Sequence, residues 1–256
     1  MFGLRNQHGS CWINAALQGI LRIPDLQNKY SDKDLEITDN PVERALQEIW
    51  ATRGEEGLKD LYQCVKVSTK MPAGEDTGDS HELLDFIWDK VPFLDKLVRF
   101  PVINVVQCKH CKYQETRKDT LTEFSLAPSS KDQLISDCIA EASQPMEISD
   151  WKCEKCKELG CTKQCLVESF PQVMVIHKTN IDNSIRYTPI FVLNKQKYAL
   201  ISIVCYTGSH WFTYGRHLPP GKPWHLFDDN HVQSFSATNF PLANTMRLLI
   251  YYRLNE

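Results

Sequence analysis

The sequence has no long apolar run and no excess of basic charge. None of its 256 residues lies in a stretch approaching the roughly 18 apolar residues of a membrane span, and the N-terminus lacks the apolar core of a secretory signal. Lys and Arg number 29 against 32 Asp and Glu, which gives a net charge of −3, whereas nucleic-acid-binding domains usually carry a basic excess. We therefore expect an intracellular protein, cytoplasmic or nuclear, that binds neither nucleic acid nor membranes.

Cysteine is too sparse for a disulfide-stabilised scaffold. The ten cysteines make up about 4% of the chain, below the roughly 8–10% of such scaffolds. Four of them form two C-x-x-C pairs, Cys108 with Cys111 and Cys153 with Cys156. In a reducing compartment this spacing is typical of metal ligands. Hydrophobic residues make up 42% of the chain, enough for a core in one large domain or two small ones.

The first third of the chain is expected to be helical. Apolar residues after Ser10 recur with the i, i+3, i+4 spacing of a core-facing helix, which Pro24 should end. Asn40 followed by Pro41 is a typical helix start. A third helix is predicted after Asp79, where a capping-box pattern precedes an apolar stripe.

Strands are expected to dominate the last third. Branched and aromatic residues predict strands over 173–176, 198–206, 211–214 and 248–252. The middle, roughly 100–165, holds both C-x-x-C pairs, a strand-like piece over 121–126 and a short helix around Ile135. Helices first and strands later indicate an α+β fold rather than a parallel α/β sheet.

Cys11 is a candidate nucleophile because of its place at the start of the first predicted helix. Unpaired N–H groups and the positive end of the helix dipole favour a thiolate there, directly after Ser10 as a cap. The alternative is a buried cysteine packed at a helix start. Helix position alone does not separate the two.

A cysteine nucleophile needs a base, and the base needs an orienting group. His210 lies at a turn before an aromatic strand, and Asp228 ends another short strand. Two neighbouring antiparallel strands would bring these side chains together. His8 is too close in sequence to Cys11 to reach its sulfur usefully, and His177 is expected to be a core or edge histidine.

Three stretches resemble the motifs of the ubiquitin-specific proteases. Residues 3–18 (GLRNQHGSCWINAALQ) are similar to the cysteine box, 209–214 (SHWFTY) to the histidine box, and 224–229 (WHLFDD) to the W-x-x-F-D-D segment. The resemblance covers nearly the whole chain. It implies an α+β, papain-like cysteine protease fold with a single catalytic domain over 1–256, divided into a thumb of about 1–95, zinc-bearing fingers of about 96–169 and a palm of about 170–256.

The resemblance also implies the roles of individual residues. Cys11 is the expected nucleophile and His210 its general base, while Asp228 orients the imidazole, with Asp229 as a possible substitute. Asn6 matches the residue that stabilises the oxyanion. The alternative for Asn6 is a turn-forming residue before the helix.

The expected reaction is hydrolysis of the isopeptide bond after the C-terminal Gly-Gly of ubiquitin or a ubiquitin-like modifier. Asp79 and Glu82 match acidic residues that bind the ubiquitin tail, although Asp79-x-x-Glu82 is also an ordinary capping box. Thr77 and Gly78 replace the family's glutamines. Trp12 and the short loop before His210 are features of a branch that removes SUMO, so a SUMO-specific isopeptidase is one alternative and an inactive modifier-binding module another.

The resemblance places a structural zinc ion in the fingers. Four thiolates from Cys108, Cys111, Cys153 and Cys156 suit tetrahedral Zn²⁺ and leave no open position for catalysis. Two alternatives remain open, a site that persists without metal and substitution by Cys161 or Cys165.

Overall fold

The computed structural model describes residues 1–7, 9–71, 78–180, 182–237, 239–242 and 244–254. His8 and most of the predicted loop over 70–78, with Thr77, lie outside these residues. No helix within the described part is both long and apolar enough to span a bilayer.

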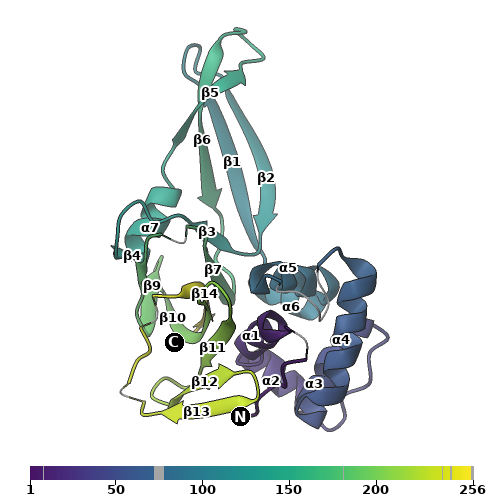
Figure 1. Ribbon diagram of the computed structural model, residues 1–256. Helices are drawn as coiled ribbons and strands as arrows, with labels where there is room; N and C mark the ends of the chain where they lie inside the picture. Colours follow the sequence, from purple (N-terminus) through teal and green to yellow (C-terminus); the bar gives the residue numbers. More distant parts are fainter. Residues whose placement is uncertain (8, 72–77, 181, 238, 243, 255–256) are drawn as a thin grey trace.

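The described helices before Phe100 pack together as one lobe (Figure 1). They are α1 (Cys11–Ile20), α2 (Pro24–Tyr30), α3 (Pro41–Thr52), α4 (Glu55–Ser68), α5 (Ser80–Lys90) and α6 (Pro92–Val98). The helices predicted after Ser10, Asn40 and Asp79 are confirmed as α1, α3 and α5. The Asn40 side chain caps α3 by accepting the N–H groups of its first turn.

Two details of the helix predictions are wrong. Ser10 is the N-cap residue of α1, but its side chain makes no capping bond, because the hydroxyl accepts the Gln7 N–H at 2.9 Å instead. Pro24 does not end the first helix. It begins α2, where the missing N–H of proline costs no hydrogen bond.

A narrow four-stranded sheet projects away from the rest of the molecule (Figure 1). Its order is β2-β1-β6-β5, with bounds β1 (Phe100–Cys108), β2 (Gln114–Leu121), β5 (Met146–Lys152) and β6 (Leu159–Val167). All residues of β2 are exposed. We call this sheet the distal sheet.

The second large sheet has eight strands in the order β13-β12-β11-β10-β14-β7-β3, with β9 also paired to β10. Its strands are β3 (Phe124–Leu126), β7 (Val173–Lys178), β9 (Ile190–Leu193), β10 (Gln196–Tyr206), β11 (Trp211–Gly215), β12 (Trp224–Asp228), β13 (His231–Phe235) and β14 (Met246–Arg253). We call it the central sheet. The four strands predicted in the last third of the chain all belong to it.

The segment between the distal strands returns to the central sheet. The strand-like piece predicted over 121–126 is split, because β2 ends at Leu121 and β3 pairs in parallel with β7. The predicted short helix is α7 (Ile135–Ala142), flanked by a small pairing of β4 (Gln133–Leu134) with β8 (Ile185–Arg186).

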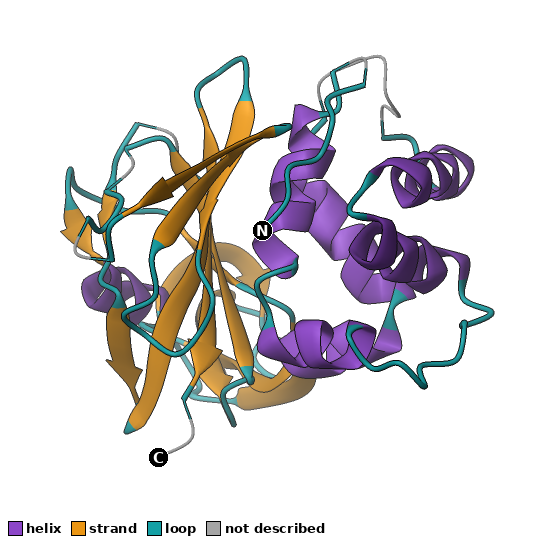
Figure 2. Ribbon diagram, turned by 90° about the horizontal axis from the view of Figure 1, so that it is seen from below, coloured by secondary structure: helices purple, strands orange, loops and turns teal. Residues whose placement is uncertain are grey.

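The central sheet is buried on both faces. Along β14, Leu248 and Ile250 join the core cluster beneath the helices, while Leu249 and Tyr251 join a second cluster on the opposite face. This alternation is the two-residue period of a strand. Figure 2 shows the helical lobe covering one side of the sheet. The rigid contact between helices and sheet fixes the position of α1 against β11, where the candidate site lies.

Candidate active site

Cys11 is the first residue of α1 and lies against the start of β11. Its residue is 3% exposed, and the backbone of Trp211, the neighbour of His210, is close enough to oppose the rise in the pKa of its thiol. The Thr213 hydroxyl donates to the Ala15 carbonyl at 2.7 Å, which ties β11 to α1. Residues 11 and 210, far apart in sequence, thus lie on neighbouring segments where the helical lobe joins the central sheet.

His210 and Asp228 form a direct pair, as predicted from the strand arrangement. β11 and β12 are antiparallel neighbours, and His210 Nε2 lies 2.6 Å from Asp228 Oδ1. A neutral imidazole that donates from Nε2 to the carboxylate keeps Nδ1 unprotonated. Nδ1 is therefore the ring nitrogen with a lone pair able to accept a proton.

Asp229 has a different partner set from the one expected of a substitute for Asp228. Its carboxylate accepts the Asn6 amide at 2.9 Å and the Asn14 amide at 2.8 Å, while its carbonyl accepts the Leu4 N–H at 2.9 Å. Its φ of 52° lies in the left-handed region, a conformation uncommon outside glycine, and often kept at functional sites. Asp229 thus attaches the segment before α1 to the end of β12.

Asn6 is held on both sides of its side chain. Its Oδ1 accepts the Ser10 N–H at 3.0 Å while its Nδ2 donates to Asp229. One amide hydrogen remains for another acceptor, since Nδ2 carries two. The bond to Ser10 fits the turn-forming alternative, while the bond to Asp229 reaches beyond the turn. The sequence pattern does not single out Asn14, the buried asparagine one helical turn beyond Cys11 that also donates to Asp229.

The Cys11 thiol is not stabilised as a thiolate in this conformation. Burial raises the pKa of the thiol, and the charge of Asp229 adds to the rise. Hydrogen bonds from the backbone of Trp211, Trp12 and Cys11 itself oppose this change without reversing it. The backbone N–H groups at the helix start lower the pKa as expected, but desolvation outweighs them.

Asp79 caps α5 and Glu82 lies in its first turn. The Asp79 carboxylate accepts the His81 N–H at 2.8 Å, so the capping alternative describes a real interaction. Glu82 is exposed.

Gly78 packs against the indole of Trp12. A Cβ at residue 78 would lie 2.6 Å from Trp12 Cε2, closer than real Cβ atoms approach. The Ser80 hydroxyl also donates to the Trp12 carbonyl at 2.7 Å. The two departures from the family motif, a tryptophan after Cys11 and a glycine in place of a glutamine, are thus sterically coupled.

The four cysteines of the C-x-x-C pairs meet at the far end of the distal sheet. Cys108 Sγ lies 3.6 Å from Cys156 Sγ, and Cys111 Sγ lies 3.7 Å from Cys153 Sγ. Tetrahedral Zn²⁺ with Zn–S bonds of about 2.3 Å places sulfurs about 3.8 Å apart, whereas a disulfide needs about 2.05 Å. Hydrogen bonds from the backbone of Cys111 and His110 lower the pKa of Cys108 to about 6 against the effect of burial. The cluster therefore fits a thiolate metal site.

Cys161 and Cys165 do not belong to that cluster. The four sulfurs that could share one ion come from Cys108, Cys111, Cys153 and Cys156, whereas Cys161 is buried within β6 and Cys165 is half-buried further along it. All ten cysteines of the chain are free thiols.

A Cys–His–Asp constellation between a helical lobe and an antiparallel sheet defines a papain-like thiol hydrolase. The sequence matches the family described as ubiquitin carboxyl-terminal hydrolase over residues 2–251. The chain belongs to this family, and its fold is that of a ubiquitin-specific protease catalytic domain.

Relatives and solved structures agree with this assignment. Ubiquitin carboxyl-terminal hydrolase 24 of Homo sapiens is 26% identical over 201 residues, which are 68% of this chain and 7% of that protein. Ubiquitin carboxyl-terminal hydrolase 5 of Saccharomyces cerevisiae is 23% identical over 191 residues, 58% of this chain and 23% of that protein. The chain thus spans only a small part of the length of these relatives.

The fold matches a chain of the SAGA DUB module of Ubp8, Sgf11, Sus1 and Sgf73. The module bound to ubiquitin aldehyde gives a TM-score of 0.79 at 17% identity, covering 100% of this chain and 70% of the matched chain. The module bound to monoubiquitin gives 0.80 at 18% identity, covering 100% and 69%.

Proposed function

We propose that the chain is a thiol isopeptidase that removes ubiquitin from protein conjugates by hydrolysis after the C-terminal Gly-Gly. The observation that carries this proposal is the 2.6 Å pair of His210 with Asp228 at the start of β11, the strand that Thr213 ties to α1 and so to Cys11. Membership of the ubiquitin carboxyl-terminal hydrolase family supports the substrate class.

The chemistry follows from the ring orientation of His210. Nδ1 takes the proton of Cys11 as the sulfur attacks the carbonyl carbon of the terminal glycine. The imidazolium, paired with Asp228, gives that proton to the departing lysine amine when the C–N bond breaks and a thioester forms. Water then loses a proton to His210, adds to the thioester and releases Cys11 as the thiol with the modifier's carboxylate. Because the resting thiol is desolvated, we infer that proton transfer to His210 accompanies attack.

Asn6 and Asp229 complete the proposed machinery. The second Asn6 amide hydrogen and the backbone N–H of Cys11 would bind the oxyanion, where one such donor is worth about 2.7–4 kcal/mol. Asp229 would act as a positioning residue, because it holds Asn6 and Asn14 in place. Asp79 and Glu82, at the start of α5, would bind basic groups of the modifier tail.

We assign Zn²⁺ to the cysteine quartet and the family's three parts to the chain. When bound, the ion supplies a structural crosslink between the β1–β2 and β5–β6 hairpins at the far end of the distal sheet. The helical lobe corresponds to the thumb, the distal sheet to the fingers and the central sheet to the palm. Ten free thiols fit a reducing compartment, cytoplasmic or nuclear, and we propose no nucleic-acid or membrane partner.

Probes with an electrophilic C-terminus provide the decisive test. Ubiquitin and SUMO forms of the probe are compared for covalent labelling of the wild-type chain, of Cys11→Ala, and of Cys64→Ala as a half-buried cysteine outside the site. We expect ubiquitin labelling of wild type and Cys64→Ala and none of Cys11→Ala, which should still bind unmodified ubiquitin.

The other outcomes separate the alternatives. Preferential labelling by the SUMO probe would assign the chain to SUMO. The close packing of Trp12 against Gly78 would then be a candidate cause of that preference. Binding without labelling or turnover by wild type would make it an inactive binding module. Labelling that persists in Cys11→Ala would refute the nucleophile.

A further inference from the structure

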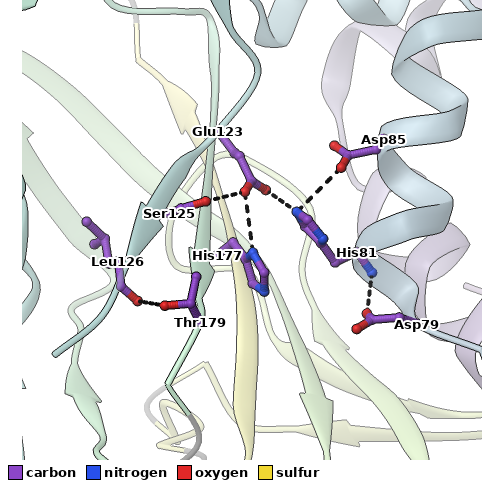
Figure 3. A network of polar contacts seen from close by, with 8 residues as sticks. All are labelled: Asp79, His81, Asp85, Glu123, Ser125, Leu126, His177 and Thr179. Carbon is purple, nitrogen blue, oxygen red and sulfur yellow. Dashed lines mark hydrogen bonds and ion pairs between the residues drawn. The ribbon is translucent and has the colours of Figure 1, made fainter. Parts of the chain in front are cut away.

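A second cluster of metal-binding side chains lies away from both Cys11 and the cysteine quartet. It joins His81 from the first turn of α5, Glu123 from the turn between β2 and β3, and His177 from β7 (Figure 3). The three residues therefore come from the helical lobe, the base of the distal sheet and the central sheet. The sequence pattern predicts that His177 is a core or edge histidine and does not single out His81.

The three side chains converge on one point. His81 Nε2 lies 2.7 Å from Glu123 Oε2, and His177 Nδ1 lies 3.3 Å from Glu123 Oε1. The two imidazoles are stacked with their centroids 3.8 Å apart and 23° between their planes. One ligand atom from each residue lies within 4.8 Å of the others. Side-chain exposures of 20%, 15% and 13% for His81, Glu123 and His177 show that solvent reaches the cluster only in part.

The donor set is the one that borderline divalent metals prefer. Two imidazole nitrogens and one carboxylate oxygen form a common three-residue zinc set with an open fourth position. Hydrogen bonds from His177, His81 and Ser125 lower the pKa of Glu123 to about 2, although its burial acts in the opposite direction. The carboxylate is therefore ionised at neutral pH. Neutral imidazoles can bind a cation at these nitrogens by carrying their protons on the other ring nitrogen.

The surroundings supply a supporting shell and an entry path. The Ser125 hydroxyl donates to Glu123 Oε1 at 2.6 Å and fixes the carboxylate, as outer-shell groups do in metal sites. Asp85 Oδ2 lies 3.6 Å from His81 Nε2 and adds a negative charge beside the cluster. Asp85, Glu123 and Ser125 also line a cleft of about 540 Å³ that opens to solvent.

We propose that His81, Glu123 and His177 bind one divalent transition-metal ion, Zn²⁺ or a metal of similar preference. The ion would crosslink α5 to β7, and so the helical lobe to the central sheet. His81 lies between Asp79 and Glu82 at the start of α5. The site is independent of the cysteine quartet, and the proposal does not rest on the proposed hydrolase activity.

Cobalt provides a test that separates this site from the thiolates. Co²⁺ is titrated into the full chain whose quartet already holds zinc, and the visible spectrum and stoichiometry are recorded. We expect one additional Co²⁺ per chain with d–d bands but without a thiolate-to-cobalt charge-transfer band. His81→Ala and His177→Ala should lose this saturable binding, Ser125→Ala should weaken it about tenfold or more, and His231→Ala, an exposed histidine on β13, should leave it unchanged.

The variants can lose stability because the ion pairs themselves are lost, so a second readout is the rise in Tm on adding Zn²⁺ to each folded protein. Wild type should show this increment and His177→Ala should not, whatever its starting Tm. Three results would overturn the proposal: no saturable binding by wild type, binding by His81→Ala and His177→Ala that equals binding by wild type, or binding that disappears only in His210→Ala. The last would place the ion on His210, Asp228 and Asp229, which also lie within 4.8 Å of one another.

Discussion

The distal and central sheets are held together by different means. One apolar core cluster joins the helical lobe to the central sheet, and the other joins α7 and its surroundings to the opposite face of that sheet. No described residue of 103–121 or 146–167 belongs to either cluster. In the distal sheet, β2 is exposed along its whole length, whereas Cys108 and Cys153 are fully buried at its far end. The central sheet is therefore stabilised by burial of hydrocarbon on two faces, and we expect the distal sheet to depend on the metal site proposed at the cysteine quartet.

The largest expected effect comes from removing the thiolate site. Cys111→Ser combined with Cys156→Ser removes two ligands, and a structural zinc site contributes on the order of 10 kcal/mol to the folding of its own module. Backbone amides of β1, β2, β5 and β6 should then lose protection in hydrogen exchange, while those of β10 and β14 keep it. Cys165→Ser, a half-buried cysteine of β6 outside the quartet, is the control. Equal loss of protection in both sheets would show that they unfold as one unit.

Truncation of core leucines should show the reverse pattern. Leu249→Ala removes a fully buried side chain from β14, and such changes cost about 2–5 kcal/mol. Leu166→Ala on β6, where the leucine is 42% exposed, should change stability by about 0.5 kcal/mol or less. Urea unfolding, followed with a probe in the central sheet, compares the loss of stability in the two variants. Similar costs for both variants would contradict the distinction between the sheets.

The sequence predicted those parts of the fold that depend on local pattern. The apolar stripe after Ser10 has the spacing of a helix, and Asn40–Pro41 is a typical helix start. The strand over 248–252 is a short run of apolar and aromatic residues buried on both faces, so composition reveals it. The pairing of His210 with Asp228 was predictable because two short strands in succession usually pair. The sequence did not predict β2 as a strand, because QETRKDTL has no alternation of apolar and polar residues. The segment is held as a strand by antiparallel pairing with β1.

Contacts between distant segments were not predictable in the same way. The bonds from Asn6 and Asn14 to Asp229 cross more than 200 residues of sequence, and the two separate motifs that contain these residues do not predict the contacts. Glu123 lies beside an exposed strand, and only the folded chain places it between two histidines. The raised pKa of Cys11 likewise depends on burial that a helix start does not reveal.

A smaller effect is expected at Gly78, where steric crowding rather than backbone conformation disfavours a larger residue. Gly78→Ala places a methyl group 2.6 Å from Trp12 and should cost about 1–3 kcal/mol, as overpacked cores do. Trp12→Phe in the same chain should recover most of this cost because it removes the crowded ring atoms. Gly160→Ala in the distal sheet, at a φ of +102° with its nearest neighbour atom 3.7 Å away, is the matched comparison. Its cost arises from the backbone, so rescue by Trp12→Phe there would contradict the steric account.

The smallest effect is a pH dependence at the contact between α2 and the loop after β11. Burial lowers the pKa of His217 to about 4, with a further contribution from the charge of Arg22, and its Nδ1 lies 3.0 Å from Gln27 Oε1. Unfolded histidine titrates near 6.5, so between about pH 6.5 and 4 the unfolded chain binds a proton that the folded chain does not. Stability contributed by a neutral His217 is therefore complete above pH 6.5 and decreases as the pH falls toward 4. Urea midpoints measured between about pH 7 and 5 should fall less steeply for His217→Gln than for wild type or for His231→Gln, and parallel curves would assign the acid sensitivity of this junction to other groups.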